Sequence, residues 1–345
     1  MPKKSTEDSE NSRARYTLLT HFRREPILLE FAMSDTLIEE TLLESPAQLP
    51  YHIEGKETGF PSIHATVSQT ESGTYFLTKP GVTLLSKPQV HLLNLAPFLE
   101  GFDPALGFSD YLEDETPLPD AAQLCKTAGQ LCYASFGPKR TQNDNASRYF
   151  RNILSSGHGS VLEHANFSFL FYGISRSVTH ELVRHRAGVG FSQLSQRYVS
   201  GAVLRFVERP EYQNDEELHR LFVERIDHAA HDYARIADAL LARQKTGSEI
   251  LSGEAKTDLR KKVQQTARSV LPNETEAPIV VTANVRAWRH ILEMRASPHA
   301  ETEIRELAFR TYLCLAAADP VLFADYKTVK LSDGTYGVET ETEKV

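Results

Sequence analysis

The segment from Arg184 to Arg197 holds residues whose types and spacing favour the binding of an anion. It carries three arginines, a histidine and two serines around a glycine-rich step, in the order Arg-His-Arg-Ala-Gly-Val-Gly-Phe-Ser-Gln-Leu-Ser-Gln-Arg. An arginine presents a rigid fork of N–H donors that matches phosphate oxygens, and hydroxyls and loop amides complete such a cradle. A helix dipole alone favours cations near a helix end, but it does not explain Gln193, Ser195 and Arg197. The segment therefore predicts a site for a phosphate-bearing molecule.

A second constellation runs from Asn284 to Arg305. On a helix, Arg286 and His290 lie four residues apart and share a face. Arg295 falls at an expected break between two helices, where its side chain is free to point into a cleft. The alternative is a charged surface of Arg–Glu pairs, which suits Arg305 better than the set as a whole.

Two smaller motifs are less specific on their own. His158-Gly-Ser160-Val-Leu-Glu-His164 places a glycine turn beside polar side chains, which fits either a ligand-facing corner or a loop with local hydrogen bonds. Arg268-Ser-Val-Leu-Pro272 sets an arginine before a helix stop, which is a common arrangement. Neither motif alone assigns a function.

Hydrophobic spacing indicates the elements that must position these motifs. Phe167, Phe169 and Phe171 alternate within 166–173, as in a half-buried strand. A helix is expected from Ser175 into the basic cluster, and the glycines that follow it release the backbone. The remaining expectations are strands at 90–95 and 279–282, and helices at 146–155, at 213–246 and up to 270. One helix should end near Arg295 and another should start at Ser297-Pro298, which suits a cap and a first turn.

Composition and charge limit the possible function classes. The 345 residues are 41% hydrophobic and 24% charged, which fits one large globular domain or two modest ones. A net charge of -8 argues against a general affinity for nucleic acid or an anionic membrane. The longest apolar run, near Phe167–Ile174, is too short to span a membrane, and residues 1–15 lack the apolar segment of a signal peptide. We therefore expect a cytoplasmic enzyme.

The three cysteines are an odd and sparse set, which argues against a disulfide framework. Cys125 and Cys132 lie seven residues apart on an expected helix beside apolar residues, a spacing that indicates core packing. No cysteine lies near the arginine clusters in the sequence. A thiolate nucleophile is therefore not supported, and no metal site is expected.

Taken together, the motifs resemble the flavin-dependent thymidylate synthase family. The resemblance extends over residues 88–338, in the family's order and spacing. It leaves 1–87 as an N-terminal extension without a recognised motif and 339–345 as a C-terminal tail. The matching words are Gly157-His-Gly-Ser-Val-Leu-Glu-His164, Gly173-Ile-Ser-Arg-Ser177, His180-Glu-Leu-Val-Arg-His-Arg186, Ser192-Gln-Leu-Ser-Gln-Arg-Tyr198, Ala267-Arg-Ser-Val-Leu-Pro272, Asn284-Val-Arg-Ala-Trp-Arg-His290, Met294-Arg-Ala-Ser-Pro-His-Ala300 and Glu303-Ile-Arg305.

The resemblance implies an α/β (α+β) fold, with a mixed sheet flanked by long helices, and a reductive methylation of dUMP to dTMP. NADPH reduces FAD, methylenetetrahydrofolate supplies the carbon, and C5 of dUMP receives it as a methyl group without a cysteine nucleophile. The protein supplies positioning and electrostatics. The resemblance also implies a homotetramer with active sites between subunits, so that a monomer would be inactive.

Carried over position by position, the resemblance also implies roles for individual residues. Arg295 matches the residue that stabilises uracil ionised at N3, which makes C5 more nucleophilic. The resemblance implies two further catalytic residues, Ser195 and His164, and it places His164 near the folate and the flavin. Flavin contacts are implied for Ser160, Arg184, His185, Arg186, Gln193, Asn284, Val285, Arg286 and His290. Nucleotide contacts are implied for Glu181, Leu182, Val183, Arg184, Gln193, Leu194, Ser195, Gln196, Arg197, Arg268 and Arg295.

The chain departs from the family pattern after Arg186. The segment Ala187–Leu194 has eight residues, one more than the family's usual spacing before the serine. The extra residue motivates an alternative, in which a flavoenzyme of the same fold methylates or hydroxymethylates another pyrimidine nucleotide such as UMP. A second alternative is a catalytically silent nucleotide- or flavin-binding module, and a nucleic-acid-binding role is weaker because the net charge is negative.

Overall fold

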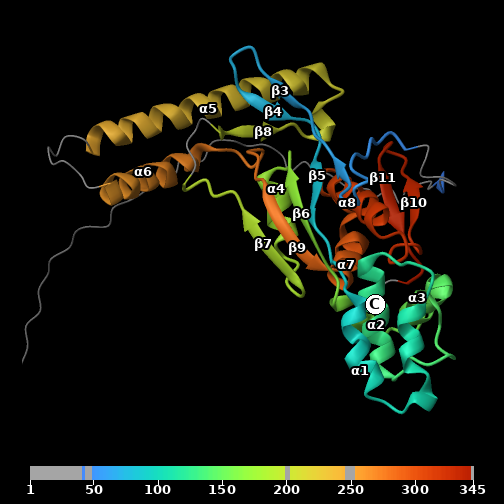
Figure 1. Cartoon of the computed structure of the whole chain (residues 1–345). Helices are drawn as coiled ribbons and strands as arrows, with labels where there is room; N and C mark the ends of the chain where they lie inside the picture. The colour runs from blue at the N-terminus through green and yellow to red at the C-terminus, as the bar shows by residue number, and fades with distance from the viewer. Residues whose placement is uncertain (1–40, 43–48, 199–202, 245–252, 343–345) are drawn as a thin grey trace, which may run out of the picture. The chain divides into compact units, whose positions relative to one another are not determined.

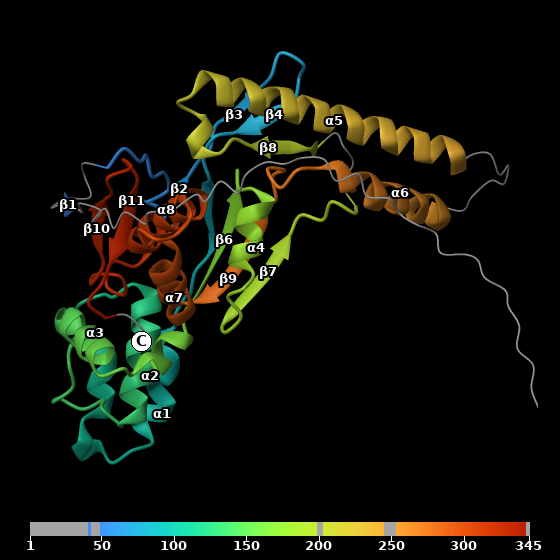
Figure 2. The same cartoon turned by 180° about the vertical axis from the view of Figure 1, so that it is seen from behind.

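The computed structural model describes residues 41–42, 49–198, 203–244 and 253–342, which belong to one compact unit (Figures 1 and 2). Every neighbouring pair of strands in its main sheet is antiparallel. Because side chains alternate between the faces of a sheet, the register decides which residues meet in the core. The strand order is β2 (Ser62–Ile63), β5 (Gly81–Ser86), β6 (Asn166–Tyr172), β9 (Ile279–Asn284) and β7 (Val189–Gln193).

One face of this sheet carries the core. The three alternating phenylalanines of β6 are buried on it, as the sequence predicts, and Phe169 lies opposite Val281 of β9. Trp288 packs edge-on against Phe169 with ring centroids 5.3 Å apart, and its indole N–H donates to the carbonyl of Phe167 at 3.2 Å. The helix that carries Trp288 is thereby fixed on the sheet.

Helices pack into the same core. α7 (Val285–Arg295) and α8 (Thr302–Ala318) contribute much of it, and α4 (Arg176–Leu182) follows β6 along the chain. The hydroxyl of Ser175 accepts from the N–H of Val178 at 3.3 Å, so the expected helix start is confirmed. The other helices of this part are α1 (Ala96–Glu100), α2 (Asp120–Cys132) and α3 (Ala146–Ser155), with 3-10 turns η2 (Leu92–Leu95), η3 (Pro104–Leu106), η4 (Phe108–Glu113), η5 (Asn143–Asn145) and η6 (Gly159–Glu163).

A second, three-stranded sheet lies beneath a long helix. β3 (Val67–Gln69) pairs antiparallel with β4 (Tyr75–Leu77), and β4 pairs parallel with β8 (Arg205–Val207). Phe222 and Ile226 of α5 (Glu216–Gln244) pack on Phe76 and Phe206 of this sheet. α6 (Gly253–Ala267) runs beside α5 (Figure 1), and η8 (Pro210–Tyr212) and η9 (Arg268–Val270) flank the two helices in sequence.

The third sheet contains β1 (Thr41–Leu42), β10 (Lys327–Lys330) and β11 (Tyr336–Glu339), all antiparallel.

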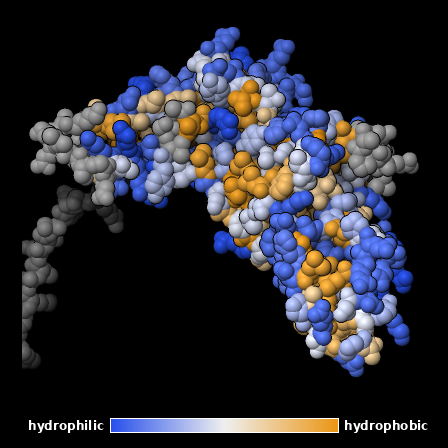
Figure 3. Space-filling model, viewed as in Figure 1, coloured by the Kyte–Doolittle hydropathy of each residue, from blue (hydrophilic) through white to orange (hydrophobic). Residues whose placement is uncertain are grey.

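Figure 3 shows apolar residues at the surface of the helical part around α1 and α2. Among the described residues, no helix is long and apolar enough to cross a lipid bilayer. The large exposed apolar and aromatic side chains of the helical part are Leu93, Phe98, Phe102, Leu106, Leu131 and Tyr133.

The α+β class predicted from the sequence is confirmed, with two differences in its arrangement. The main sheet is antiparallel throughout, and the parallel pair β4–β8 belongs to the second sheet. In addition, β2 and β5 come from the segment 1–87 expected to be an extension, and β5 pairs with β6 at the centre of the main sheet. The boundary expected after residue 87 therefore does not coincide with a division of the described chain, because buried residues such as Val82 are part of the main core.

Four local expectations were wrong. Residues 90–95 contain the 3-10 turn η2 rather than a strand, and 189–193 form β7 rather than a loop. α8 begins at Thr302, after Ser297-Pro298, because the carboxylate of Glu301 accepts from the first N–H groups of that helix. Cys132 is exposed at the end of α2, whereas Cys125 is buried as expected.

Candidate active site

The constellation that begins at Asn284 is delivered by β9 to the start of α7. Asn284 has extended φ and ψ angles of -75° and 164°, and its side-chain oxygen accepts from the N–H of Ala287 at 2.8 Å. This is the arrangement of a helix N-cap. It fixes the first turn of α7, on which Arg286 stands, and the same helix carries His290 in its middle and Arg295 in its last turn.

The loop after the basic cluster approaches this cap closely. Gly188 has a φ of +69°, and a Cβ built on it would lie 2.5 Å from the side-chain amide of Asn284. The N–H of Asn284 donates to the carbonyl of Gly188 at 3.1 Å. Only glycine adopts this backbone conformation without strain and leaves room for the asparagine. The two constellations predicted from the sequence therefore meet at this point.

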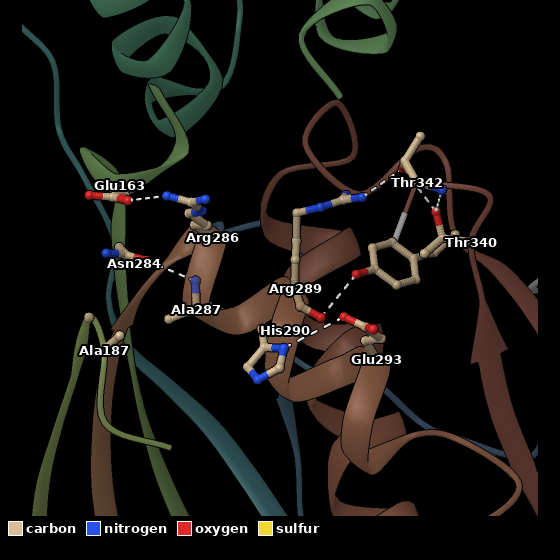
Figure 4. Close-up of a pocket in the computed structure, with 12 residues that line it drawn as sticks. Glu163, Ala187, Asn284, Arg286, Ala287, Arg289, His290, Glu293, Thr340 and Thr342 are labelled. Atoms are coloured by element: carbon tan, nitrogen blue, oxygen red, sulfur yellow. Dashed lines mark hydrogen bonds and ion pairs between the residues drawn. The ribbon is translucent and has the colours of Figure 1, made fainter. Parts of the chain in front are cut away.

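A cavity of about 420 Å³ opens beside the first turns of α7 (Figure 4). Arg286 donates to the carboxylate of Glu163 at 2.6 Å at the side of the cavity, and both side chains are about half exposed. His290 lies 3.6 Å from Glu293. The full lining is Glu163, Ala187, Gly188, Asn284, Arg286, Ala287, Arg289, His290, Glu293, Tyr326, Thr340 and Thr342.

A polar cluster surrounds the other end of α7. One guanidinium nitrogen of Arg295 donates to the carboxylate of Glu181 at 2.7 Å, another donates to the Glu181 carbonyl at 3.3 Å, and Nε donates to Nε2 of His185 at 3.1 Å. The His185 ring also lies edge-on to that of His290, with centroids 5.5 Å apart. His185 therefore contacts both Arg295 and His290, a side chain that lines the cavity.

The electrostatics of this cluster keep His185 neutral. Burial, together with the positive charge of Arg295 and the neighbouring His290, lowers the pKa of His185 to about 4. A neutral imidazole has one nitrogen that accepts, and here Nε2 takes that role toward Arg295. The cluster therefore presents one fixed guanidinium, balanced by one carboxylate, to any ligand that reaches it.

The structure groups the predicted flavin and nucleotide residues unevenly. Asn284, Arg286 and His290 share the cavity, and Glu181, His185 and Arg295 share the cluster. The side chains of Leu182 and Val285 are buried in the core, so only their main chain is available to a ligand. Arg184 and Arg186 are exposed in the turn after α4, and Val183 is partly buried there.

The other predicted residues lie outside the cavity lining. Ser160 and His164 are exposed in and just after η6, the turn that also carries Glu163. Arg268 is the first residue of η9, after α6. A further group lies at or just after the end of β7, where the hydroxyl of Ser195 accepts from the N–H of Arg197 at 3.3 Å; this group is Gln193, Leu194, Ser195, Gln196 and Arg197.

Some of the lining residues were not predicted from the sequence. Glu293 stands one helical turn after Arg289, so its position on α7 was accessible to reasoning from helical spacing. Tyr326, Thr340 and Thr342 come from the C-terminal part of the chain, which the motifs do not reach. Only the fold brings these three residues to α7.

The cysteines are not part of this site, and, among the described residues, its histidine and carboxylate side chains form no metal-binding group. Burial raises the pKa of the Cys125 and Cys314 thiols to about 12, and no cysteine lines the cavity. Within the part of the chain that the structure describes, no group of three or more His, Cys, Asp or Glu side chains is placed to hold a metal ion. The chemistry of the site thus centres on arginine, histidine and carboxylate side chains.

Comparison with known proteins assigns these motifs to a family. A family model described as thymidylate synthase complementing protein matches residues 112–321. A flavin-dependent thymidylate synthase from Mycobacterium sp. (strain KMS) is 46% identical over 221 residues, which cover 64% of this chain and 86% of the relative. One from Mycobacterium bovis (strain BCG / Pasteur 1173P2) is 44% identical over 213 residues, covering 61% and 82%.

A solved structure of a UMP/dUMP methylase, PolB, from Streptomyces cacaoi bound with 5-Br dUMP has a TM-score of 0.49 and 19% sequence identity, covering 72% of this chain and 94% of that chain. The family assignment rests on the sequence matches. The chain belongs to the flavin-dependent thymidylate synthase family. The family and the enzyme class predicted from the motifs are thereby confirmed.

Proposed function

We propose that this chain catalyses the reductive methylation of dUMP to dTMP, with methylenetetrahydrofolate as the carbon donor and FAD reduced by NADPH as the hydride source. The observation that carries the proposal is the position of α7, which joins the family's motifs. Arg286, in the first turn of the helix, and His290, in its middle, line a cavity, and at its C-terminal end Arg295 is held by Glu181 and His185. A single rigid element thus aligns the residues proposed for the cofactor with those proposed for the nucleotide.

The residues at the cavity suit a flavin dinucleotide. Arg286 offers a cation of the kind that binds phosphate oxygens, and His290 stands on the same face of α7. The absence of a side chain at Gly188 leaves room for the amide of Asn284, which lines the cavity. When bound, the flavin supplies the hydride. Ser160, Arg184, His185, Arg186, Gln193, Asn284, Val285, Arg286 and His290 are the proposed flavin residues.

Arg295 is proposed as the residue that acts on the uracil ring. Its side chain is 17% exposed, and the bonds from Glu181 and His185 hold its guanidinium in one orientation. A fixed cation stabilises a uracil that has lost its N3 proton, which raises the electron density at C5. Because His185 is neutral, it orients this cation without adding a second positive charge.

The remaining nucleotide residues are proposed to act across a subunit contact. Ser195, Arg197 and Arg268 lie outside the lining of the cavity within one chain. We propose that a homotetramer brings such residues, with Gln193, Leu194 and Gln196, to a neighbouring copy's site, and that His164 lies toward the folate. We propose that the enzyme acts in the cytoplasm and that it binds the free nucleotide dUMP, not a nucleic acid or a membrane.

A second candidate substrate is UMP. The extra residue between Arg186 and Ser195 falls in the segment that forms β7, and β7 is an edge strand that pairs only with β9 within the described sheet. A length change there alters the segment that leads to the proposed nucleotide residues. The same site would then methylate or hydroxymethylate a ribonucleotide.

The decisive experiment is product analysis with purified protein, methylenetetrahydrofolate, NADPH and FAD, supplied with dUMP and UMP in parallel reactions. We expect dTMP, and we expect its formation to require every component. Turnover of UMP alone would select the second candidate. Tight binding of FAD and dUMP without product under any reductant would instead identify a silent binding module.

A further inference from the structure

The C-terminal segment beyond β11 contributes to the cavity that holds Arg286 and His290. Thr340 and Thr342 line this cavity (Figure 4). Tyr326, which precedes β10, also lines it. All three residues lie beyond position 321, where the match to the family model ends. This wall of the cavity is therefore built by a part of the chain to which the family motifs assign no role.

The segment is anchored to one carboxylate. The hydroxyls of Thr340 and Thr342 each donate to Oδ2 of Asp325 at 2.5 Å, and the N–H of Thr342 donates to the Thr340 hydroxyl oxygen at 3.2 Å. Arg289 donates to both oxygens of the same carboxylate, at 2.8 and 2.6 Å. Asp325 thus ties the C-terminal segment and α7 to one point.

This carboxylate remains ionised at neutral pH. Burial would raise the pKa of Asp325, but the hydrogen bonds and charge of Arg289 and the hydroxyls of Thr340 and Thr342 outweigh burial and hold that pKa below its usual value. Hydrogen bonds to an ionised acceptor are among the stronger ones in proteins. The ionised Asp325 carboxylate therefore holds Thr340 and Thr342 in place through strong hydrogen bonds.

The anchor continues into the backbone and side chains of α7. Arg289 is only 4% exposed, its guanidinium lies 4.8 Å from the centroid of the Tyr326 ring, and the hydroxyl of Tyr326 donates to the Arg289 carbonyl at 3.2 Å. Arg289 directly precedes His290 and stands three residues after Arg286. Its fixation therefore sets how α7 presents both of these side chains to the cavity.

We propose that the segment Thr340–Thr342 is a positioning element of the cofactor site, which closes one wall of the cavity and, through Asp325 and Arg289, orients Arg286 and His290 toward bound FAD. This inference rests on the proposed function, because it takes the cavity to be the flavin site. It assigns to the C-terminal tail a role in cofactor affinity that the sequence motifs do not suggest.

The test compares FAD binding by full-length variants. The double variant Thr340→Val and Thr342→Val keeps the shape of the side chains but removes both hydroxyls, and the double serine variant restores the hydroxyls. Thr335→Val is the matched control, because the hydroxyl of Thr335 also donates to an aspartate, Asp333, at 2.6 Å, yet Thr335 is not part of this cavity. Thermal unfolding of each apoprotein reports folding separately.

We expect the valine double variant to bind FAD about tenfold more weakly, which corresponds to about 1.4 kcal/mol, and to alter the visible absorption spectrum of bound flavin. The serine variant and the Thr335 control should bind FAD as wild type does. Unchanged affinity and spectrum in the valine variant, or an equal loss in the control, would overturn the inference. If the inference fails in this way but the wild-type protein binds FAD, the proposed function stands. If the wild-type protein binds no FAD, the proposed function and the inference both fail.

Discussion

Replacing Arg295 by alanine should lower kcat about 10²–10³-fold, because the loss of one fixed donor aimed at developing charge costs about 2.7–4 kcal/mol. The folding cost should be far smaller. Glu181 loses its partner, but its side chain is 32% exposed and the pair is screened by solvent, so we expect about 1 kcal/mol. For a chain of 345 residues, at about 2.1 cal/mol/K of unfolding entropy per residue, that corresponds to a Tm lower by about 1–2 °C. FAD affinity should change less than turnover, because Arg295 does not line the cavity at the start of α7.

The assay measures dTMP formation at saturating dUMP and folate, together with FAD titration of the apoprotein. Arg225→Ala is the matched control, because Arg225 also pairs with a glutamate and donates two hydrogen bonds to the carboxylate of Glu274, at 2.9 and 2.7 Å. The control should show a similar folding cost and wild-type turnover. Equal losses of turnover and FAD affinity in the Arg295 variant would refute the assignment of this residue to the nucleotide.

Three further predictions follow from local geometry. Gly188→Ala should weaken FAD binding and lower the free energy of unfolding by about 1–2 kcal/mol for the left-handed backbone alone, with a further loss because the new methyl group meets Asn284. Gly157→Ala is the control, because Gly157 has a φ of +68° and nothing within 4 Å, so it should carry only the backbone cost. An equal loss of FAD affinity in both variants would contradict the role of the close approach at Gly188. NMR titration of His185 should give a pKa of about 4, below its usual 6.5. Because the unfolded chain takes up this proton first, the free energy of unfolding should be highest above pH 6.5 and should fall as the pH drops toward 4. A titration near 6.5 would show that the ring is solvated. Thiol reagents should label Cys132 alone among the cysteines of the native protein, and Cys132→Ser should keep full activity, whereas an inactive serine variant would implicate this thiol in the reaction.

Sequence reasoning succeeded where the local pattern and the tertiary environment require the same structure. The alternating phenylalanines of β6 have a period of two, and one face of the sheet needs that period to form a core. Ser175 begins α4 because its hydroxyl satisfies an N–H that the helix leaves without a partner. Both signals lie within a few residues of the element that they specify.

Sequence reasoning failed where distant partners decide the outcome. Val189–Gln193 contains a glycine and reads as a loop, yet the backbone of β9 supplies a complete antiparallel partner, so the segment becomes a strand. The same holds for the site: the motifs specified Arg286, His290 and Arg295, but not the C-terminal threonines. Their approach to the cavity depends on Asp325 and on the course of the third sheet, which no local pattern encodes.

The length of α7 has a consequence for how the family can vary. Its 11 residues rise about 16 Å at 1.5 Å per residue, so the cap at Asn284 and the guanidinium-bearing residue Arg295 are separated by a rigid spacer. Insertion or deletion of one residue within α7 would rotate everything beyond it by about 100° and turn Arg295 away from Glu181. Changes in chain length should therefore accumulate in the segments around α7 and not in the helix itself. The length of α7 therefore sets the distance between the cavity residues near its start and Arg295 at its end.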